Sequence, residues 1–291
     1  MKKRGNKLGF WFFETVVKTS GLRAAYCFLY LICLHYLLFD PSARRGAMAY
    51  IQRRFPEATA PKRLWLVYQL FISQGKNLID RYVYSIDPSI FNLEERGFEK
   101  LDALRTDSKQ GFVLLTAHTG NWQIAMRALE RFDRTVHLLM RPEDNVAVQE
   151  SLQIQAANEK IKIISVEGPM GGMVETMKAL QQGDIVSIMG DRHYGHRAVP
   201  VDFCGATAQF PCAAFLIAAS ANCPVVTLLS SKTGTQTYQV NIADHLIPCW
   251  DRSQPKEEQL QQWTQRFASG LEEYLRDRPL QCFLFHNIWK V

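Results

Sequence analysis

Several common catalytic signatures are missing from this sequence of 291 residues. There is no G-x-S-x-G motif, so a serine hydrolase would lack its nucleophile elbow. There is no G-x-x-x-x-G-K-[ST] motif either, which excludes the usual phosphate-binding loop. Repeats of fixed period and low-complexity tracts are also absent. The composition, 47% hydrophobic and 21% charged, is that of a globular protein long enough to form a substantial core.

No pair of cysteines has the C-x-x-C spacing of a zinc or redox site, and the number of cysteines is odd. Most of them lie in apolar surroundings, which predicts reduced, buried thiols in a protein that faces the cytosol. His193 and His196 are candidate metal ligands, but no carboxylate or cysteine pattern completes a site around them. We therefore expect no metal and no disulfide framework. The seven cysteines are Cys27, Cys33, Cys204, Cys212, Cys223, Cys249 and Cys282.

Acidic residues are scarce at the start of the chain, where Glu14 and Asp40 are the only two within the first 54 positions. Ten basic residues share that region, whereas the net charge of the whole chain is only +6. Such asymmetry suits an anionic surface, either membrane phospholipid or nucleic acid. No stacking-aromatic motif, zinc-finger spacing or helix-turn-helix signal is present, so we favour an anionic membrane lipid as the partner and expect no nucleic acid.

A run of apolar residues from 24 to 39, "AAYCFLYLICLHYLLF", contains His35 as its only clearly polar residue. As a helix it would cover about 24 Å, somewhat short of the roughly 20 residues that span a bilayer. No small-residue cleavage site follows, so we do not expect a removed signal peptide. We interpret residues 8–39 as a membrane-embedded or interfacial anchor. The alternative is a buried helical hairpin in a soluble core.

Beyond this region, strand-like and helix-like patterns alternate, which predicts an α/β fold with a mostly parallel sheet flanked by helices. We expect an N-terminal helical membrane-anchoring segment over residues 1–41 and a catalytic α/β domain over 42–291. The predicted strands are 111–117, 136–140, 161–165, 184–191, 224–230 and 238–243. The predicted helices are 43–54, 62–82, 121–132, 145–158, 170–182, 211–222 and 257–276.

Polar residues gather where three of these strands end, the position at which parallel sheets collect their chemistry. The first such segment, "AHTGNWQ" (117–123), places His118 beyond the strand, Gly120 in a tight turn and Asn121 where it can cap the next helix. Gln123 then lies close enough to reach back to the imidazole. A histidine oriented by a neighbour is the general-base half of a catalytic dyad. The alternative is a strand-end histidine satisfied by local backbone.

The other two segments are "MRPEDN" (140–145) and "GDRHYGHR" (190–197). They place Arg141, Asp191 and Arg192 at neighbouring strand ends, which favours a site over an isolated histidine. We take Arg141, Asp191 and Arg192 as candidate site residues and Asn121 as a candidate substrate-binding residue.

In these blocks the sequence resembles the late acyltransferases of lipid A biosynthesis, within the lysophospholipid acyltransferase superfamily. The similarity is strongest from about Phe91 onward. "AHTGNWQ" resembles the family's histidine block, usually a histidine, any residue, GNW and then glutamate. "MRPEDN" resembles its arginine block, and "GDRHYGHRAVPVDFCG" (190–205) its aspartate-centred block. "GFEKL" (97–101) and "RPLQCFLFHNIWK" (278–290) are similar to segments that precede and follow these blocks.

The resemblance implies transfer of an acyl chain from a thioester, carried by acyl carrier protein or coenzyme A, onto a membrane lipid. No further cofactor is implied. His118 would be the base, Gln123 would occupy the orienting position, and Arg141, Asp191 and Arg192 would bind phosphate or carrier. The resemblance also implies the cell inner membrane, with the catalytic domain facing the cytoplasm.

Gln123 departs from the family pattern, because a glutamine supplies no negative charge to the histidine. Its carbonyl oxygen can still accept a hydrogen bond from Nδ1–H and fix the tautomer. Three readings follow: the enzyme works with a weaker base, another carboxylate such as Asp191 compensates, or the protein is catalytically silent and only binds lipid or carrier. A weaker base suits an amine acceptor as well as a hydroxyl. A thioesterase that uses water as acceptor is a further alternative.

Overall fold

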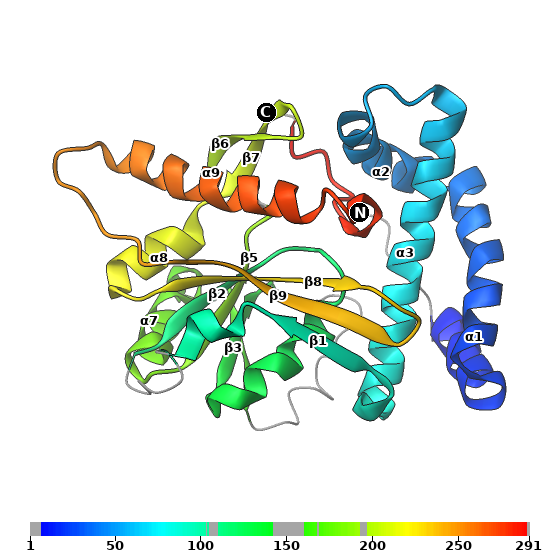
Figure 1. Ribbon diagram of the computed structural model, residues 1–291, viewed down its shortest axis with the longest axis horizontal. Helices are drawn as coiled ribbons and strands as arrows, with labels where there is room; N and C mark the ends of the chain where they lie inside the picture. The colour runs from blue at the N-terminus through cyan, green and yellow to red at the C-terminus, as the bar shows by residue number, and fades with distance from the viewer. Residues whose placement is uncertain are drawn as a thin grey trace.

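The computed structural model describes residues 7–102, 104, 110–141, 160–167, 169–192 and 197–289. Its centre is a seven-stranded sheet in the order β1-β9-β8-β2-β5-β3-β4 (Figure 1). Neighbouring strands are parallel throughout, except for the antiparallel pair β8 and β9. The strands are β1 Asn92–Arg96, β2 Phe112–Thr116, β3 Val136–Met140, β4 Ile161–Ser165, β5 Ile185–Met189, β8 Val225–Lys232 and β9 Thr237–Leu246. The α/β fold with a mostly parallel sheet is therefore confirmed.

Both faces of the sheet are covered, which explains why the central strands β2 and β5 are mostly apolar on both faces. In β2, the side chains of Val113 and Leu115 enter one core, whereas those of Phe112 and Leu114 enter the other. This alternation follows from the two-residue period of a strand. The first core is shared with α7 Met173–Gln181, α8 Ala213–Ala221 and α9 Lys256–Tyr274, and the second with η2 Phe98–Leu101, α5 Trp122–Ala125 and η3 Met126–Phe132.

A separate hairpin, β6 Ala198–Phe203 and β7 Ala206–Pro211, packs against α9. Its inner side chains, Phe203 and Phe210, are fully buried and contact each other with ring centroids 5.3 Å apart. The Trp289 ring stacks on Phe203, and its Nε1–H donates to the Phe203 carbonyl at 3.1 Å. The hairpin therefore fixes the position of the C-terminal segment.

Three helices precede the sheet: α1 Lys7–Phe39, α2 Pro41–Arg54 and α3 Ala60–Ile86. Figure 1 shows α3 standing between the sheet and α1, which lies on its outer side. Helix α3 has Pro61 in its first turn and presents a buried stripe that includes Leu66, Leu70 and Val83, the spacing of an amphipathic helix. Helix α1 is bent at Gly21, whose φ of 80° and ψ of 176° suit only glycine.

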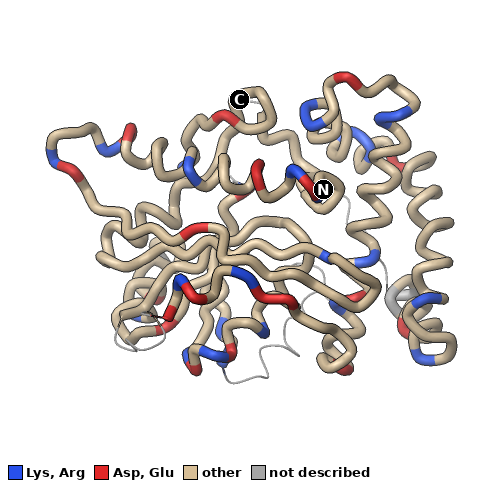
Figure 2. The backbone as a smooth tube through the Cα atoms, in the orientation of Figure 1, with Lys and Arg blue, Asp and Glu red and all other residues tan. Residues whose placement is uncertain are grey.

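From Trp11 to Phe39, α1 is long and apolar enough to cross a membrane, and only 22% of its most apolar stretch is buried inside the protein. A core helix of a soluble protein would be mostly buried, so this low fraction argues against the alternative of a buried hairpin. Figure 2 shows the upper length of α1 free of charged residues. Its outward face exposes Phe28, Tyr30, Leu31, Leu34, Leu38 and Phe39.

Most predicted elements lie within a few residues of observed ones, but the prediction and the structure differ at three places. Strand β1 and the β6–β7 hairpin were not predicted, and the predicted helix over 121–132 divides into α5 and the 3₁₀ helix η3. The predicted helix over 145–158 lies outside the described residues. The division into residues 1–41 and 42–291 stays a prediction.

Candidate active site

The ends of two adjacent strands bring a histidine and an aspartate together. β2 and β5 are parallel and in register from Phe112 with Ile185 to Thr116 with Met189. His118 and Asp191 each lie two residues beyond the last pair, so both emerge at the same edge of the sheet. The two residues are 73 positions apart in the sequence, and only the strand order makes them neighbours.

Asp191 holds His118 by two hydrogen bonds. The backbone N–H of His118 donates to Oδ2 at 2.7 Å, and the imidazole Nδ1 lies 2.8 Å from Oδ1. The Asp191 side chain is 1% exposed and that of His118 is 25% exposed. The carboxylate is therefore turned toward the histidine, while the imidazole still reaches the surface of the site.

The charge on Asp191 decides which nitrogen of His118 carries the proton. Burial alone would raise the pKa of Asp191, but the charge and hydrogen bonds of His118, together with the charge of Arg192, hold it below its ordinary value. An ionised carboxylate only accepts hydrogen bonds, so Nδ1 donates to Asp191 in the neutral imidazole. This leaves the lone pair on Nε2 available to accept a proton.

The turn after His118 is fixed by its contacts with α3 and β8. Gly120 has a φ of 51°, and a Cβ there would lie 2.4 Å from the Ser230 carbonyl oxygen. Asn77 on α3 donates from Nδ2 to the Gly120 carbonyl at 2.7 Å. Asn121 accepts from the Ile124 N–H through Oδ1 and donates from Nδ2 to the Asn77 carbonyl. Both polar ends of the Asn121 side chain thus bond within the protein, and its predicted substrate contact stays a prediction.

The C-terminal segment also holds this turn. The Phe283 N–H donates to the His118 carbonyl at 2.8 Å, and the Gly120 N–H donates to the Gln281 carbonyl at 3.3 Å. Cys282 between them is 1% exposed. Sequence reasoning did not assign these residues or Asn77 to the site. For Asn77, the available signal was a pair of polar side chains, Asn77 and Asp80, on the otherwise apolar buried stripe of α3.

Gln123 lies in the first turn of α5 and is 2% exposed. It was expected to accept a hydrogen bond from Nδ1 of His118, but Asp191 holds that nitrogen. Asp191 thus supplies, next to the imidazole, the negative charge that a glutamine lacks. The catalytic role of Gln123 itself stays a prediction. Of the three readings of Gln123, the geometry favours compensation by Asp191.

A family model for bacterial lipid A biosynthesis acyltransferases matches residues 21–291, nearly the whole chain. The chain belongs to this family. Among curated proteins, none matches it. Membership supports enzymatic transfer of an acyl group to a lipid precursor and, together with the apolar helix α1, association with a membrane.

The two predicted arginines differ in their surroundings. Arg192 directly follows Asp191, and its guanidinium donates to the Phe283 carbonyl, so it ties the C-terminal segment to the end of β5. Arg141 follows β3, the strand beside β5, and its side chain is 52% exposed with Nε 3.6 Å from Oε1 of Glu167. Arg141 remains accessible to an anionic substrate, and both substrate contacts stay predictions.

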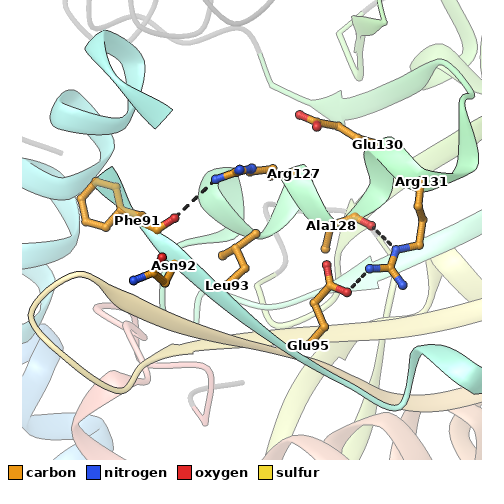
Figure 3. A pocket seen from close by; sticks show the side chains of 8 residues that line it. All are labelled: Phe91, Asn92, Leu93, Glu95, Arg127, Ala128, Glu130 and Arg131. Carbon is orange, nitrogen blue, oxygen red and sulfur yellow. Dashed lines mark hydrogen bonds and ion pairs between the residues drawn. The ribbon is translucent and has the colours of Figure 1, made fainter. Parts of the chain in front are cut away.

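A hollow of about 390 Å³ lies between β1 and η3, lined by Phe91, Asn92, Leu93, Glu95, Arg127, Ala128, Glu130 and Arg131 (Figure 3). Its arginines are bonded within the protein: Arg127 donates to the Phe91 carbonyl at 3.3 Å, and Arg131 pairs with Glu95. Neither His118 nor Asp191 lines this hollow, so it is separate from the candidate site at the ends of β2 and β5.

Over the part of the chain that the structure describes, no three histidine, cysteine, aspartate or glutamate side chains gather in a group able to hold a metal ion. His193 and His196 lie outside that part.

Proposed function

We propose that this protein transfers a fatty acyl chain from an acyl thioester to a hydroxyl or amino group of a membrane lipid or lipid precursor. The observation that carries the proposal is the pairing of His118 with the ionised, buried Asp191, which leaves Nε2 free as a base. The donor would be acyl carrier protein or acyl coenzyme A, and the reaction would need no resident cofactor.

The geometry accounts for each proton in such a transfer. Nε2 of His118 takes the proton of the acceptor as its oxygen or nitrogen attacks the thioester carbonyl carbon. The tetrahedral intermediate collapses, the carbon–sulfur bond breaks, and the departing sulfur receives the proton from the imidazolium. Asp191 accepts a hydrogen bond throughout and stabilises the transient positive charge, as buried carboxylates do beside catalytic histidines.

We place the reaction at the inner membrane, with the catalytic domain on the cytoplasmic side. The exposed apolar face of α1 and the basic residues on either side of its apolar stretch support this location. An anionic lipid surface is the partner that these basic residues fit.

The decisive experiment supplies the purified protein with a radiolabelled acyl thioester and a bacterial lipid extract. We expect label in the lipid fraction, and His118→Ala should reduce the rate by about 10²- to 10⁴-fold, the usual contribution of a general base. Label released as free fatty acid would indicate a thioesterase. No turnover with either carrier would indicate a silent lipid- or carrier-binding protein.

A further inference from the structure

A group of polar side chains is buried between α1, α3 and the sheet, where the surrounding contacts are apolar. Asn77 and Asp80 on α3 are 6% and 0% exposed. Figure 1 shows α3 between the sheet on one side and α1 on the other. Polar groups at such a position contact both neighbours.

Asn77 contacts the turn that carries the catalytic histidine. Its side-chain Nδ2 donates to the Gly120 carbonyl at 2.7 Å, and its backbone carbonyl accepts from Nδ2 of Asn121 at 3.2 Å. On the other side, Gly120 lies so close to β8 that a Cβ at this position would clash with the Ser230 carbonyl. Two residues after His118, the backbone is thus held between α3 and β8.

Asp80, one turn further along α3, accepts hydrogen bonds from residues on two other elements. Its carboxylate accepts from the Tyr26 hydroxyl of α1 and from the Tyr238 hydroxyl of β9. Nζ of Lys232, at the end of β8, lies 2.5 Å from Oδ2. The Tyr238 hydroxyl also lies 2.8 Å from Oδ1 of Asn77. An unbroken series of contacts therefore runs from Tyr26 through Asp80, Tyr238 and Asn77 to Gly120.

Stability alone does not account for this arrangement. Burial raises the pKa of Asp80 and lowers that of Lys232, so desolvation disfavours both charges. Well-packed apolar residues often replace buried ion pairs without loss of stability. The best-attested use of buried polar groups is to fix one arrangement of elements over others. Here the arrangement that they fix is that of α1, α3, β9 and the His118 turn.

We propose that Asn77, Asp80 and Tyr238 are positioning residues for His118, and that Tyr26 makes their arrangement depend on how α1 is seated against α3. The helix that anchors the protein is thereby coupled to the geometry of the base. Only the kinetic test of this proposal requires that the protein has the acyl-transfer activity proposed above. A second measurement, on His118 itself, is independent of turnover.

Two hydroxyl deletions and one matched control test the coupling. Tyr26→Phe and Tyr238→Phe each break the series while keeping the ring. Tyr68→Phe is the control, because the Tyr68 hydroxyl also crosses from α3 to α1, where it donates to the Tyr30 carbonyl at 3.1 Å, but does not contact the series. The full-length protein in phospholipid vesicles is assayed for kcat and KM, and histidine-labelled protein gives the NMR resonances of His118, assigned by their loss in His118→Ala.

We expect Tyr26→Phe and Tyr238→Phe to lower kcat by roughly 5- to 20-fold, since misplacement of a catalytic group by about 1 Å can cost up to 10²-fold. KM should stay within about twofold, because substrate binding is not what the variants change. Both variants should shift the His118 resonances, and Tyr68→Phe should change neither kcat nor the resonances.

The proposal is overturned if both variants match Tyr68→Phe, or if kcat and KM change together while the His118 resonances stay in place. Should Tyr238→Phe fail to fold, Tyr26→Phe alone decides. If the wild-type protein transfers no acyl group, the proposed function fails. The His118 resonances of Tyr26→Phe then still decide the positioning role.

Discussion

Asp191 gives His118 what a glutamine at position 123 does not, which is a negative charge next to the imidazole. A histidine that takes a proton becomes a cation, and a charge-assisted hydrogen bond is roughly twice as strong as a neutral one. In serine proteases, replacement of the buried triad aspartate by asparagine lowers kcat by about 10⁴-fold, because the amide selects the wrong tautomer. We propose that the 2.8 Å contact between Nδ1 of His118 and Asp191 has the same role here.

The low pKa of Asp191 predicts how acid affects the stability of the protein. Because the pKa of this carboxyl is lower in the folded than in the unfolded chain, its ionised form stabilises the fold. That stabilisation is complete above about pH 5 and is lost as the pH falls below about 4, through the folded-state pKa. Urea unfolding of wild type and Asp191→Asn should therefore show a difference at pH 5 and above that shrinks below pH 4. A difference that grows on acidification would contradict the assignment.

Gly120 is expected to tolerate no side chain, because its φ is positive and a Cβ would clash with β8. A second glycine, Gly205, has a positive φ without such a clash and therefore separates the two effects. Gly205→Ala, at a φ of 71° with open space around it, should lose only about 1–2 kcal/mol of unfolding free energy from backbone strain. Gly120→Ala adds a clash with the Ser230 carbonyl, so we expect a loss of about 3 kcal/mol or more and loss of activity. Denaturant unfolding of both variants measures the comparison. Equal losses of unfolding free energy in the two variants would show that the close approach of Gly120 to β8 does not contribute to the effect.

Among the elements, α1 is the one that we propose anchors the protein, through its outward face. Leu31 and Leu38 are 67% and 56% exposed in a helix that carries no charge from Ala24 to Phe39. Their burial in the acyl region of a bilayer would each contribute about 1.5–3 kcal/mol at most.

Substitution of these leucines by aspartate should therefore weaken membrane binding. We expect Leu31→Asp and Leu38→Asp to lower partitioning into anionic phospholipid vesicles by about 10-fold or more, measured by co-sedimentation at high salt. Ile247→Asp is the control, because Ile247 is equally exposed (56%) but lies in the segment between β9 and α9. If Ile247→Asp reduced binding as much, the surface of α1 would have no special role.

The strands predicted correctly from sequence are those that are buried and therefore contain runs of apolar residues. The central strands β2, β5 and β8 are buried on both faces and are nearly continuous apolar runs. β1, "NLEER", is an exposed edge strand and has no such signal. β6 contains Pro200, which argues against a strand in a sequence. Pattern alone could not show that β9 runs antiparallel to β8.

For the molecule as a whole, the components of the site could be predicted but not their pairing. His118 and Asp191 were both found at strand ends, yet the sequence does not fix that β5 lies beside β2 while β3 lies one strand further away. Gln123 was assigned to the imidazole because it is near in sequence. Asn77 on α3 and Phe283 in the C-terminal segment both contact the His118 turn. Both are far from this turn in the sequence, so no local pattern predicts these contacts.

The central claim is that Asp191, not Gln123, is the residue that supports His118 as the base. The most direct test measures kcat/KM for acyl transfer from one labelled thioester in wild type, His118→Ala, Asp191→Asn and Gln123→Ala, with circular dichroism to verify folding. We predict that His118→Ala and Asp191→Asn lose about 10²-fold or more, whereas Gln123→Ala stays within about 10-fold of wild type. A Gln123→Ala variant as inactive as His118→Ala, beside an Asp191→Asn variant close to wild type, would contradict this account.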